Sequence, residues 1–148
     1  MTRTLFVGGG SQRDLDVYDV VARAQATAIS LLEEAIAGLA TGAGADIPFP
    51  SGRAIDAAAR DVIQDAGHAG HFGHGTGHGI GLQVHEGPSL SVLSKATLRS
   101  GMVVTVEPGI YIPGQAGFRH SDTILVTDDG VEMITYYPRD LESLIIDA

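Results

Sequence analysis

Glycine occupies every second position from Gly73 to Gly81, which gives five glycines in nine residues. Glycine costs about 1 kcal/mol relative to alanine inside a helix, so this segment cannot form a stable helix. An extended chain places alternate residues on opposite faces, and one face here would carry only glycine. Such a face lets a backbone or a ligand approach very closely. We predict that the opposite face carries His74, Thr76, His78, Ile80 and Leu82.

Three histidines cluster in and after this segment: His74, His78 and His85. The odd spacing of His85 from His78 means that it must reach a common site across a bend or from a neighbouring strand. Neutral imidazole binds metals and titrates near neutrality, so the cluster suits metal coordination or proton transfer. The alternative is a glycine-rich loop with solvated histidines. Three histidines within twelve residues favour a site.

Any metal in this chain must be held by histidine and carboxylates, because the chain has no cysteine. Glu107 follows the apolar run 103–106 and precedes Pro108 and Gly109. A carboxylate buried at a strand end is costly without a partner, and a cation would supply one. The alternative is a glutamate that faces water before a turn. Arg119 and Asp122 interrupt a later apolar strand, where an ion pair between them would stabilise the sheet without any chemistry.

The pattern along the chain predicts an α+β fold with two helices followed by an antiparallel sheet. Apolar residues recur at helical spacing over 14–40 and 51–66. Ser11 or Asp14 can cap the first helix, and Gly67 can end the second. Glycine and proline predict a loop over 42–50. The expected strands are Thr2–Val7, Met102–Val106, Gly109–Ile112, Phe118–Val126 and Val131–Thr135.

Charge and hydropathy exclude two classes of partner. The chain has 18 acidic and 9 basic side chains, a formal net charge of −9, so we expect no nucleic-acid partner. A membrane-spanning helix takes about 20 consecutive apolar residues, and no apolar run approaches that length. The N-terminus lacks the apolar region of a signal peptide. We therefore expect an acidic cytoplasmic domain with no membrane partner.

Three segments of the sequence resemble the creatinase/aminopeptidase P/prolidase family, the M24-type "pita-bread" metallopeptidases. They read HGTGHGIGLQVHEGP (74–88), GMVVTVEPGIYIPG (101–114) and GFRHSDTILVTDDG (117–130), and a short motif at 2–4 matches as well. The resemblance implies a pita-bread fold with a curved antiparallel sheet. It also implies two divalent cations, often manganese or cobalt and in some members zinc, which share a bridging hydroxide. The hydroxide attacks a peptide carbonyl, frequently one that precedes proline.

The resemblance also implies a role for each matching residue. His78 and Glu107 match metal ligands, whereas His74 and His85 match histidines that contact substrate and stabilise the tetrahedral intermediate. Ser121 falls where the family has a fifth, glutamate ligand, and a neutral hydroxyl supplies no charge to hold a divalent ion. The first two ligands of the family are aspartates upstream of the residue that matches Met1.

We therefore expect residues 1–148 to form a single, N-terminally truncated catalytic domain. With two matching ligands, metal binding by this chain alone would be weak. The missing half of the family's repeated domain would leave one side of the sheet open. A second copy of the chain or another partner would then cover that side.

Two alternatives to an Xaa-Pro peptidase remain open from the sequence. Creatinase has the same fold and hydrolyses a C–N bond without the metal set, and in such an enzyme His120 and Ser121 would line a small-molecule pocket. The fold also occurs in binding modules without catalysis, such as histone chaperones. Those modules usually lose the histidines, and all three are present here.

Overall fold

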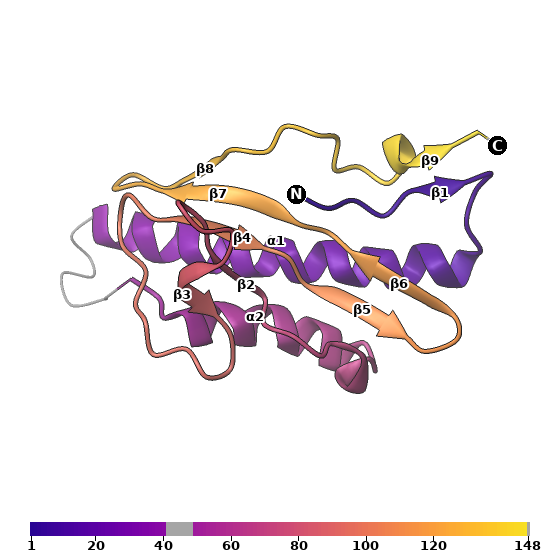
Figure 1. The fold of residues 1–148 in the computed structure, drawn as a ribbon, viewed down its shortest axis with the longest axis horizontal. Helices are drawn as coiled ribbons and strands as arrows, with labels where there is room; N and C mark the ends of the chain where they lie inside the picture. The colour runs from indigo at the N-terminus through magenta and orange to yellow at the C-terminus, as the bar shows by residue number, and fades with distance from the viewer. Residues whose placement is uncertain (41–48, 148) are drawn as a thin grey trace.

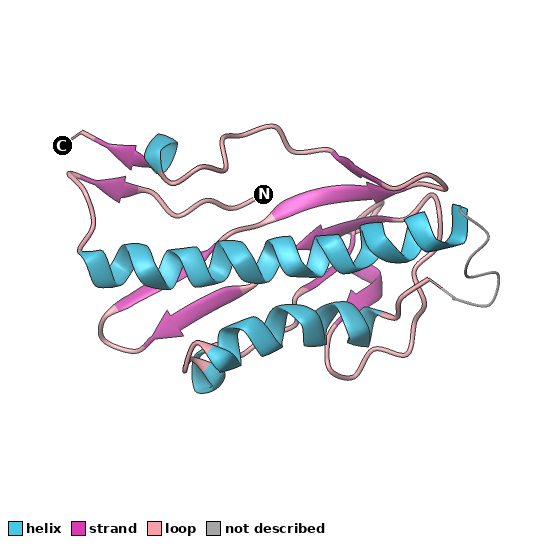
Figure 2. Ribbon diagram, turned by 180° about the vertical axis from the view of Figure 1, so that it is seen from behind, coloured by secondary structure: helices cyan, strands magenta, loops and turns pink. Residues whose placement is uncertain are grey.

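The computed structural model describes residues 1–40 and 49–147. Two helices, α1 (Gln12–Ala40) and α2 (Gly52–Asp65), pack together and cover one face of a five-stranded sheet (Figures 1 and 2). Within the described part of the chain, neither helix has the combination of length and apolarity that crossing a bilayer demands. Most of the loop predicted over 42–50 lies outside the described residues.

The main sheet is antiparallel throughout and has the strand order β3-β2-β4-β7-β8. Beside it, β5 and β6 form a hairpin, and β1 pairs in parallel with β9. Two short 3-10 helices cover Ala69–His71 and Glu142–Leu144. The strands are β1 (Phe6–Val7), β2 (Gly77–Gly79), β3 (Glu86–Leu90), β4 (Val103–Val106), β5 (Gly109–Ile112), β6 (Ala116–Arg119), β7 (Asp122–Val126), β8 (Val131–Met133) and β9 (Ile145–Ile146). The predicted α+β arrangement is confirmed.

Both helices begin where a serine satisfies a free backbone N–H. The Ser11 hydroxyl accepts a hydrogen bond from Asp14 N, so α1 starts two residues before the predicted boundary. Ser51 caps α2 in the same way through Ala54 N. Gly67 follows α2 with a φ of +85°, a backbone conformation that favours glycine, and the prediction that it ends the helix is confirmed.

The strand predictions need four corrections. Only Phe6–Val7 of the first predicted strand is extended, and Thr2 instead forms an isolated bridge with Ser121. The predicted strand Phe118–Val126 is broken at His120 and Ser121 into β6 and β7. The neighbouring strand breaks at the same level, between β4 and β5, where Pro108 has no N–H to donate. The predicted strand Val131–Thr135 ends at Met133. Strands β3 and β9 were not predicted from the pattern.

Three of the five glycines in the segment Gly73–Gly81, called here the histidine segment, lie against backbone: Gly75, Gly77 and Gly79. A Cβ added to Gly75 would lie 2.7 Å from Leu90 O, and one added to Gly79 would lie 2.3 Å from Gly87 O. These contacts allow β2 to fit between β3 and β4. The close approach is therefore made by the protein's own strands.

Gly77→Ala is expected to destabilise the protein by about 3 kcal/mol, near the upper end for an overpacked site. A Cβ at Gly77 would lie 1.8 Å from the carbonyl oxygen of Thr105, which cannot move without disturbing the pairing of β4. Urea denaturation of Gly77→Ala and of Gly73→Ala gives the comparison, because a Cβ at Gly73 meets nothing within 4 Å. Equal stabilities of the two variants would contradict the packing argument.

The core lies between the helices and the sheet, and the opposite face of the sheet is only partly covered. Alternate residues of β4 and β7 are buried toward α1, whereas Val103, Thr123 and Leu125 on the other face are half-exposed. The central buried residues are Val21, Ala24, Leu32, Ile36, Ile55, Ile63, Val104, Val106, Ile124 and Val126.

A buried carboxylate, Asp122, connects segments far apart in the chain. Arg3 Nη2 donates to its Oδ1 at 2.6 Å, and Thr135 Oγ1 donates to the same oxygen at 2.7 Å. Its Oδ2 accepts from Gln25 Nε2 at 3.0 Å and lies 3.2 Å from Arg139 Nε. One side chain thereby holds the N-terminal segment, helix α1 and the segment after β8 together.

Candidate functional site

Five of the residues singled out in the sequence line one cavity of about 380 Å³. These are His74, His78, His85, Glu107 and Arg119. They come from the histidine segment and the bend after it, from the end of β4 and from the end of β6, which are separated in sequence and adjacent in the fold (Figure 1). The predicted grouping of the three histidines with Glu107 is therefore present in the structure.

His78 and Glu107 form the most constrained pair in this cavity. His78 Nδ1 lies 2.9 Å from Gly79 O, and since a carbonyl only accepts, Nδ1 must carry the proton. In neutral imidazole the other nitrogen, Nε2, then presents a lone pair, and it lies 3.2 Å from Glu107 Oε1. Two acceptor atoms at this separation require a cation between them or a proton on Nε2.

Thr105 and Thr76 fix the backbone around this pair. The Thr105 hydroxyl accepts a hydrogen bond from His78 N at 3.1 Å and lies 3.4 Å from Glu107 Oε1. Glu107 N donates to Thr76 O at 2.6 Å. The two side chains are thereby held on adjacent backbone segments that bond to each other directly.

His74 differs from His78 because both of its ring nitrogens have partners. Its Nδ1 donates to Gly75 O at 2.7 Å, so its Nε2 accepts from the Tyr111 hydroxyl at 2.8 Å. The Tyr111 ring lies over the glycines of the β5–β6 hairpin, where a Cβ at Gly109 would come within 2.6 Å of the hydroxyl oxygen. Tyr111 was not identified from the sequence, since only the β5–β6 hairpin brings its hydroxyl to His74.

His85 lies on the exposed side of the cavity. Its ring packs on that of His78, with centroids 4.2 Å apart, and its side chain reaches the site across the bend that follows β2. Glu86 stabilises this bend by accepting a hydrogen bond from Gln83 N. The predicted approach of His85 across a bend is confirmed.

The predicted single face of the histidine segment is wrong. Only Gly77–Gly79 is extended, and the Thr76 hydroxyl bonds to Asp56 of α2 while His78 faces the cavity. Leu82 is fully exposed in the bend. Asp56 and Arg60 of α2, which hold this segment, were not identified from the sequence. They belong to a helix whose apolar spacing predicted packing against the core and gave no sign of a link to the site.

The polar residues before β7 do not form the pair that the sequence suggested. Asp122 pairs with Arg3 and Arg139, whereas Arg119 lines the cavity, because three residues of separation place the two on different sides of the chain. Ser121 is buried, and its hydroxyl donates to Glu107 Oε2 at 3.4 Å.

His120, which would line a pocket in a creatinase-like enzyme, does not line this cavity. Its Nδ1 lies 2.5 Å from the Tyr18 hydroxyl, inside the core. Burial raises the pKa of Tyr18 to about 12, so the phenol stays protonated and donates this bond.

The donor set at the cavity fits part of a metal site. Among residues 1–40 and 49–147, no group of three or more histidine, cysteine or acidic side chains is arranged to hold a metal ion. His78 and Glu107 nevertheless supply one imidazole and one carboxylate that face each other. The Nδ1–H bond of His78 to a carbonyl is the outer contact that metal-binding histidines usually make.

A family model described as metallopeptidase family M24 matches residues 1–128. The chain belongs to metallopeptidase family M24. Among curated M24-type relatives, it is 43% identical over 141 residues to an uncharacterized peptidase, YqhT, of Bacillus subtilis. It is 36% identical over 141 residues to an Xaa-Pro dipeptidase of Pyrococcus furiosus. Each of these alignments covers 95% of the chain and 36% of the relative.

The solved structures place this chain in the pita-bread fold of family M24. An Xaa-Pro dipeptidase from Bacillus anthracis superposes with a TM-score of 0.80 at 40% identity, covering 99% of this chain and 36% of that one. The chain thus spans about a third of the length of the relatives that it matches. Peptidases of this family are metal-dependent.

Proposed function

We propose that this chain provides part of the active site of a metal-dependent Xaa-Pro dipeptidase or aminopeptidase. His78 and Glu107 would hold a divalent metal ion, manganese, cobalt or zinc, together with ligands from outside residues 1–148. The substrate would be a peptide whose scissile bond precedes proline. The family and the named relatives support this reading over a creatinase-like enzyme or a binding module.

The observation that carries the proposal is the 3.2 Å separation of His78 Nε2 and Glu107 Oε1. Nδ1 of His78 is already committed to Gly79 O, so Nε2 is left as an acceptor that faces a carboxylate oxygen. A divalent cation satisfies both atoms at once. When bound, such an ion lowers the pKa of a coordinated water and polarises a carbonyl oxygen.

The remaining side chains of the cavity would act on the peptide itself. His85 is exposed beside His78 and can hold or move a proton at its ring. Arg119 adds a fixed positive charge that suits a peptide carboxylate or the oxygen of a tetrahedral intermediate. His74 is held in one tautomer by Gly75 O and Tyr111, which suits it to orient substrate.

Ser121 distinguishes this site from the family pattern. Its hydroxyl donates to Glu107, where the resemblance places a second glutamate. With a neutral hydroxyl at this position, the set of metal ligands carries one negative charge fewer than it would with glutamate. We therefore propose that this site binds metal more weakly than a site with glutamate at position 121.

The test uses the protein expressed from its complete natural coding sequence. Hydrolysis of an Xaa-Pro dipeptide and of the reversed Pro-Xaa dipeptide is measured with and without Mn²⁺ or Co²⁺, beside the Tm at each metal concentration. We expect metal-dependent cleavage of the Xaa-Pro peptide and a Tm that rises with metal, since a ligand of the folded state stabilises it. Absence of both cleavage and a Tm shift at millimolar metal would refute the proposed function.

A further inference from the structure

An ion pair on α2, between buried Asp56 and partly exposed Arg60, is directed at the histidine segment. Asp56 is fully buried, and Arg60 lies one turn further along the same helix face. Arg60 Nε donates to Asp56 Oδ2 at 2.9 Å, and Arg60 Nη2 donates to Oδ1 at 3.1 Å. A buried pair often contributes little to net stability compared with apolar residues. Stability alone therefore does not explain why both side chains also bond to the histidine segment.

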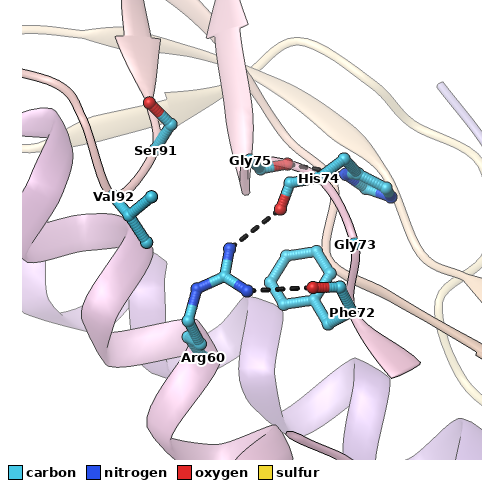
Figure 3. A pocket seen from close by; sticks show the side chains of 7 residues that line it. All are labelled: Arg60, Phe72, Gly73, His74, Gly75, Ser91 and Val92. Atoms are coloured by element: carbon cyan, nitrogen blue, oxygen red, sulfur yellow. Dashed lines mark hydrogen bonds between the residues drawn. The ribbon is translucent and has the colours of Figure 1, made fainter. Parts of the chain in front are cut away.

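Arg60 holds the start of the histidine segment through two backbone carbonyls. Nη1 donates to Phe72 O at 3.0 Å and Nη2 donates to His74 O at 2.8 Å (Figure 3). The guanidinium also lies 4.3 Å from the centroid of the Phe72 ring, whose plane meets the His74 ring edge-on. Four of the five N–H groups of Arg60 are used in these bonds and in those to Asp56. Arg60 thus bonds α2 to the backbone at Phe72 and His74 and acts as a clamp.

Asp56 holds the next part of the same segment. Its Oδ1 accepts from Thr76 N and from the Thr76 hydroxyl, both at 2.9 Å. The carbonyl of Thr76 in turn accepts from Glu107 N. One carboxylate is therefore linked, through a single buried residue, to the backbone that carries Glu107.

A cavity of about 320 Å³ lies between this clamp and the residues that follow β3, and it adjoins the candidate site. Arg60, Phe72 and Val92 line it, and it shares His74, Gly75 and Ser91 with the larger cavity (Figure 3). Without the clamp, the segment at 72–76 would border open space on this side. The side chains of α2 therefore support this segment on the side where the cavity leaves it without packing contacts.

We propose that Asp56 and Arg60 are positioning residues, which set His74 and Glu107 in register across the cavity by holding the backbone at 72–76. The proposal rests on the proposed function for its effect on turnover. A displacement of about 1 Å in a reacting group can lower the rate about a hundredfold. A clamp that fixes two such groups therefore affects kcat without any contact with substrate.

Arg60→Lys is the main test, with Arg53→Lys on the exposed side of α2 as its control. Lysine keeps a positive charge beside Asp56 but cannot reach two carbonyls and a carboxylate with a planar fork. In the complete natural protein, Arg60→Lys is expected to lower kcat about tenfold or more with KM changed less than about threefold. The NMR signals of the His74 ring are expected to shift in Arg60→Lys and to stay in place in Arg53→Lys.

Thr76→Val and Thr76→Ser test the Asp56 side of the clamp. Valine keeps the shape of the buried side chain and removes its hydroxyl, whereas serine retains the hydroxyl. We expect Thr76→Val to lose several-fold more kcat than Thr76→Ser at equal fractions of folded protein. This pair keeps the proposal testable if Arg60→Lys does not fold.

The two readouts separate this proposal from the proposed function. If the wild-type protein cleaves no Xaa-Pro peptide but Arg60→Lys shifts the His74 signals, the function is wrong and the positioning stands. If the wild-type protein is active and Arg60→Lys keeps its kcat, or loses kcat without a shift at His74, the positioning is overturned. Equal losses in Thr76→Val and Thr76→Ser would overturn the role of Asp56.

Discussion

Glu107→Gln is expected to lower hydrolysis of an Xaa-Pro dipeptide by about a hundredfold or more, beyond the effect typical of outer-shell changes at metal sites. The amide keeps the shape of the side chain and removes the charge that faces His78 Nε2 at 3.2 Å. The same amide can donate to that lone pair. In metal-free protein we therefore expect the variant to be at least as stable as the wild type, so that activity and stability change in opposite directions.

The measurement combines steady-state kinetics with melting curves in the presence and absence of Mn²⁺. Glu132→Gln, an exposed glutamate on β8, is the matched control and should retain both activity and the metal-induced rise in Tm. Glu107→Gln should lose that rise. Full activity in Glu107→Gln would remove Glu107 from the site.

Asp122→Asn is expected to cost about 3–5 kcal/mol of folding free energy, the range for breaking a buried ion pair. The Arg3 side chain is only 3% exposed, and without the carboxylate its charge would be buried without a counter-ion. Urea denaturation measures the loss, with Asp129→Asn in the exposed turn before β8 as control. A difference between the two variants of less than about 1 kcal/mol would contradict the assigned role.

The same carboxylate makes stability depend on pH in the acidic range. Burial alone would raise the pKa of Asp122, but the contacts from His120, Thr135, Arg3 and Gln25 outweigh burial and hold it well below its ordinary value of 3.8. The stabilisation is therefore complete above pH 3.8 and is lost progressively below it, where the unfolded chain binds a proton that the folded chain does not. The stability gap between wild type and Asp122→Asn should narrow in that range.

Local pattern predicted the helices closely, whereas the short strands depended on distant partners. Capping serines and Gly67 are readable signals, and both helices end within two residues of their predicted bounds. Strand β9 is two residues long, and only its pairing with β1 makes it a strand. The break at His120 lies opposite Pro108, whose carbonyl accepts from His120 N, and no local pattern encodes this pairing between strands.

The candidate site shows the same division. The histidines and Glu107 were identified because their residue types and spacing are unusual in themselves. Tyr111, Asp56 and Arg60 look ordinary in the sequence, since a tyrosine in a strand and an Asp–Arg pair on a helix are common structural features. Their roles arise from contacts between elements that only the fold brings together.

The parallel pairing of β1 with β9 has a consequence for synthesis on the ribosome. β1 is made before β9, and nearly all of the chain described here lies between them, so β1 stays unpaired with β9 while the intervening residues are made. Arg3 likewise has no carboxylate partner until Asp122 has been made. The nascent chain would carry an unpaired strand edge and an uncompensated arginine until β9 and Asp122 have been made, and chaperones that shield strand edges would act during that interval.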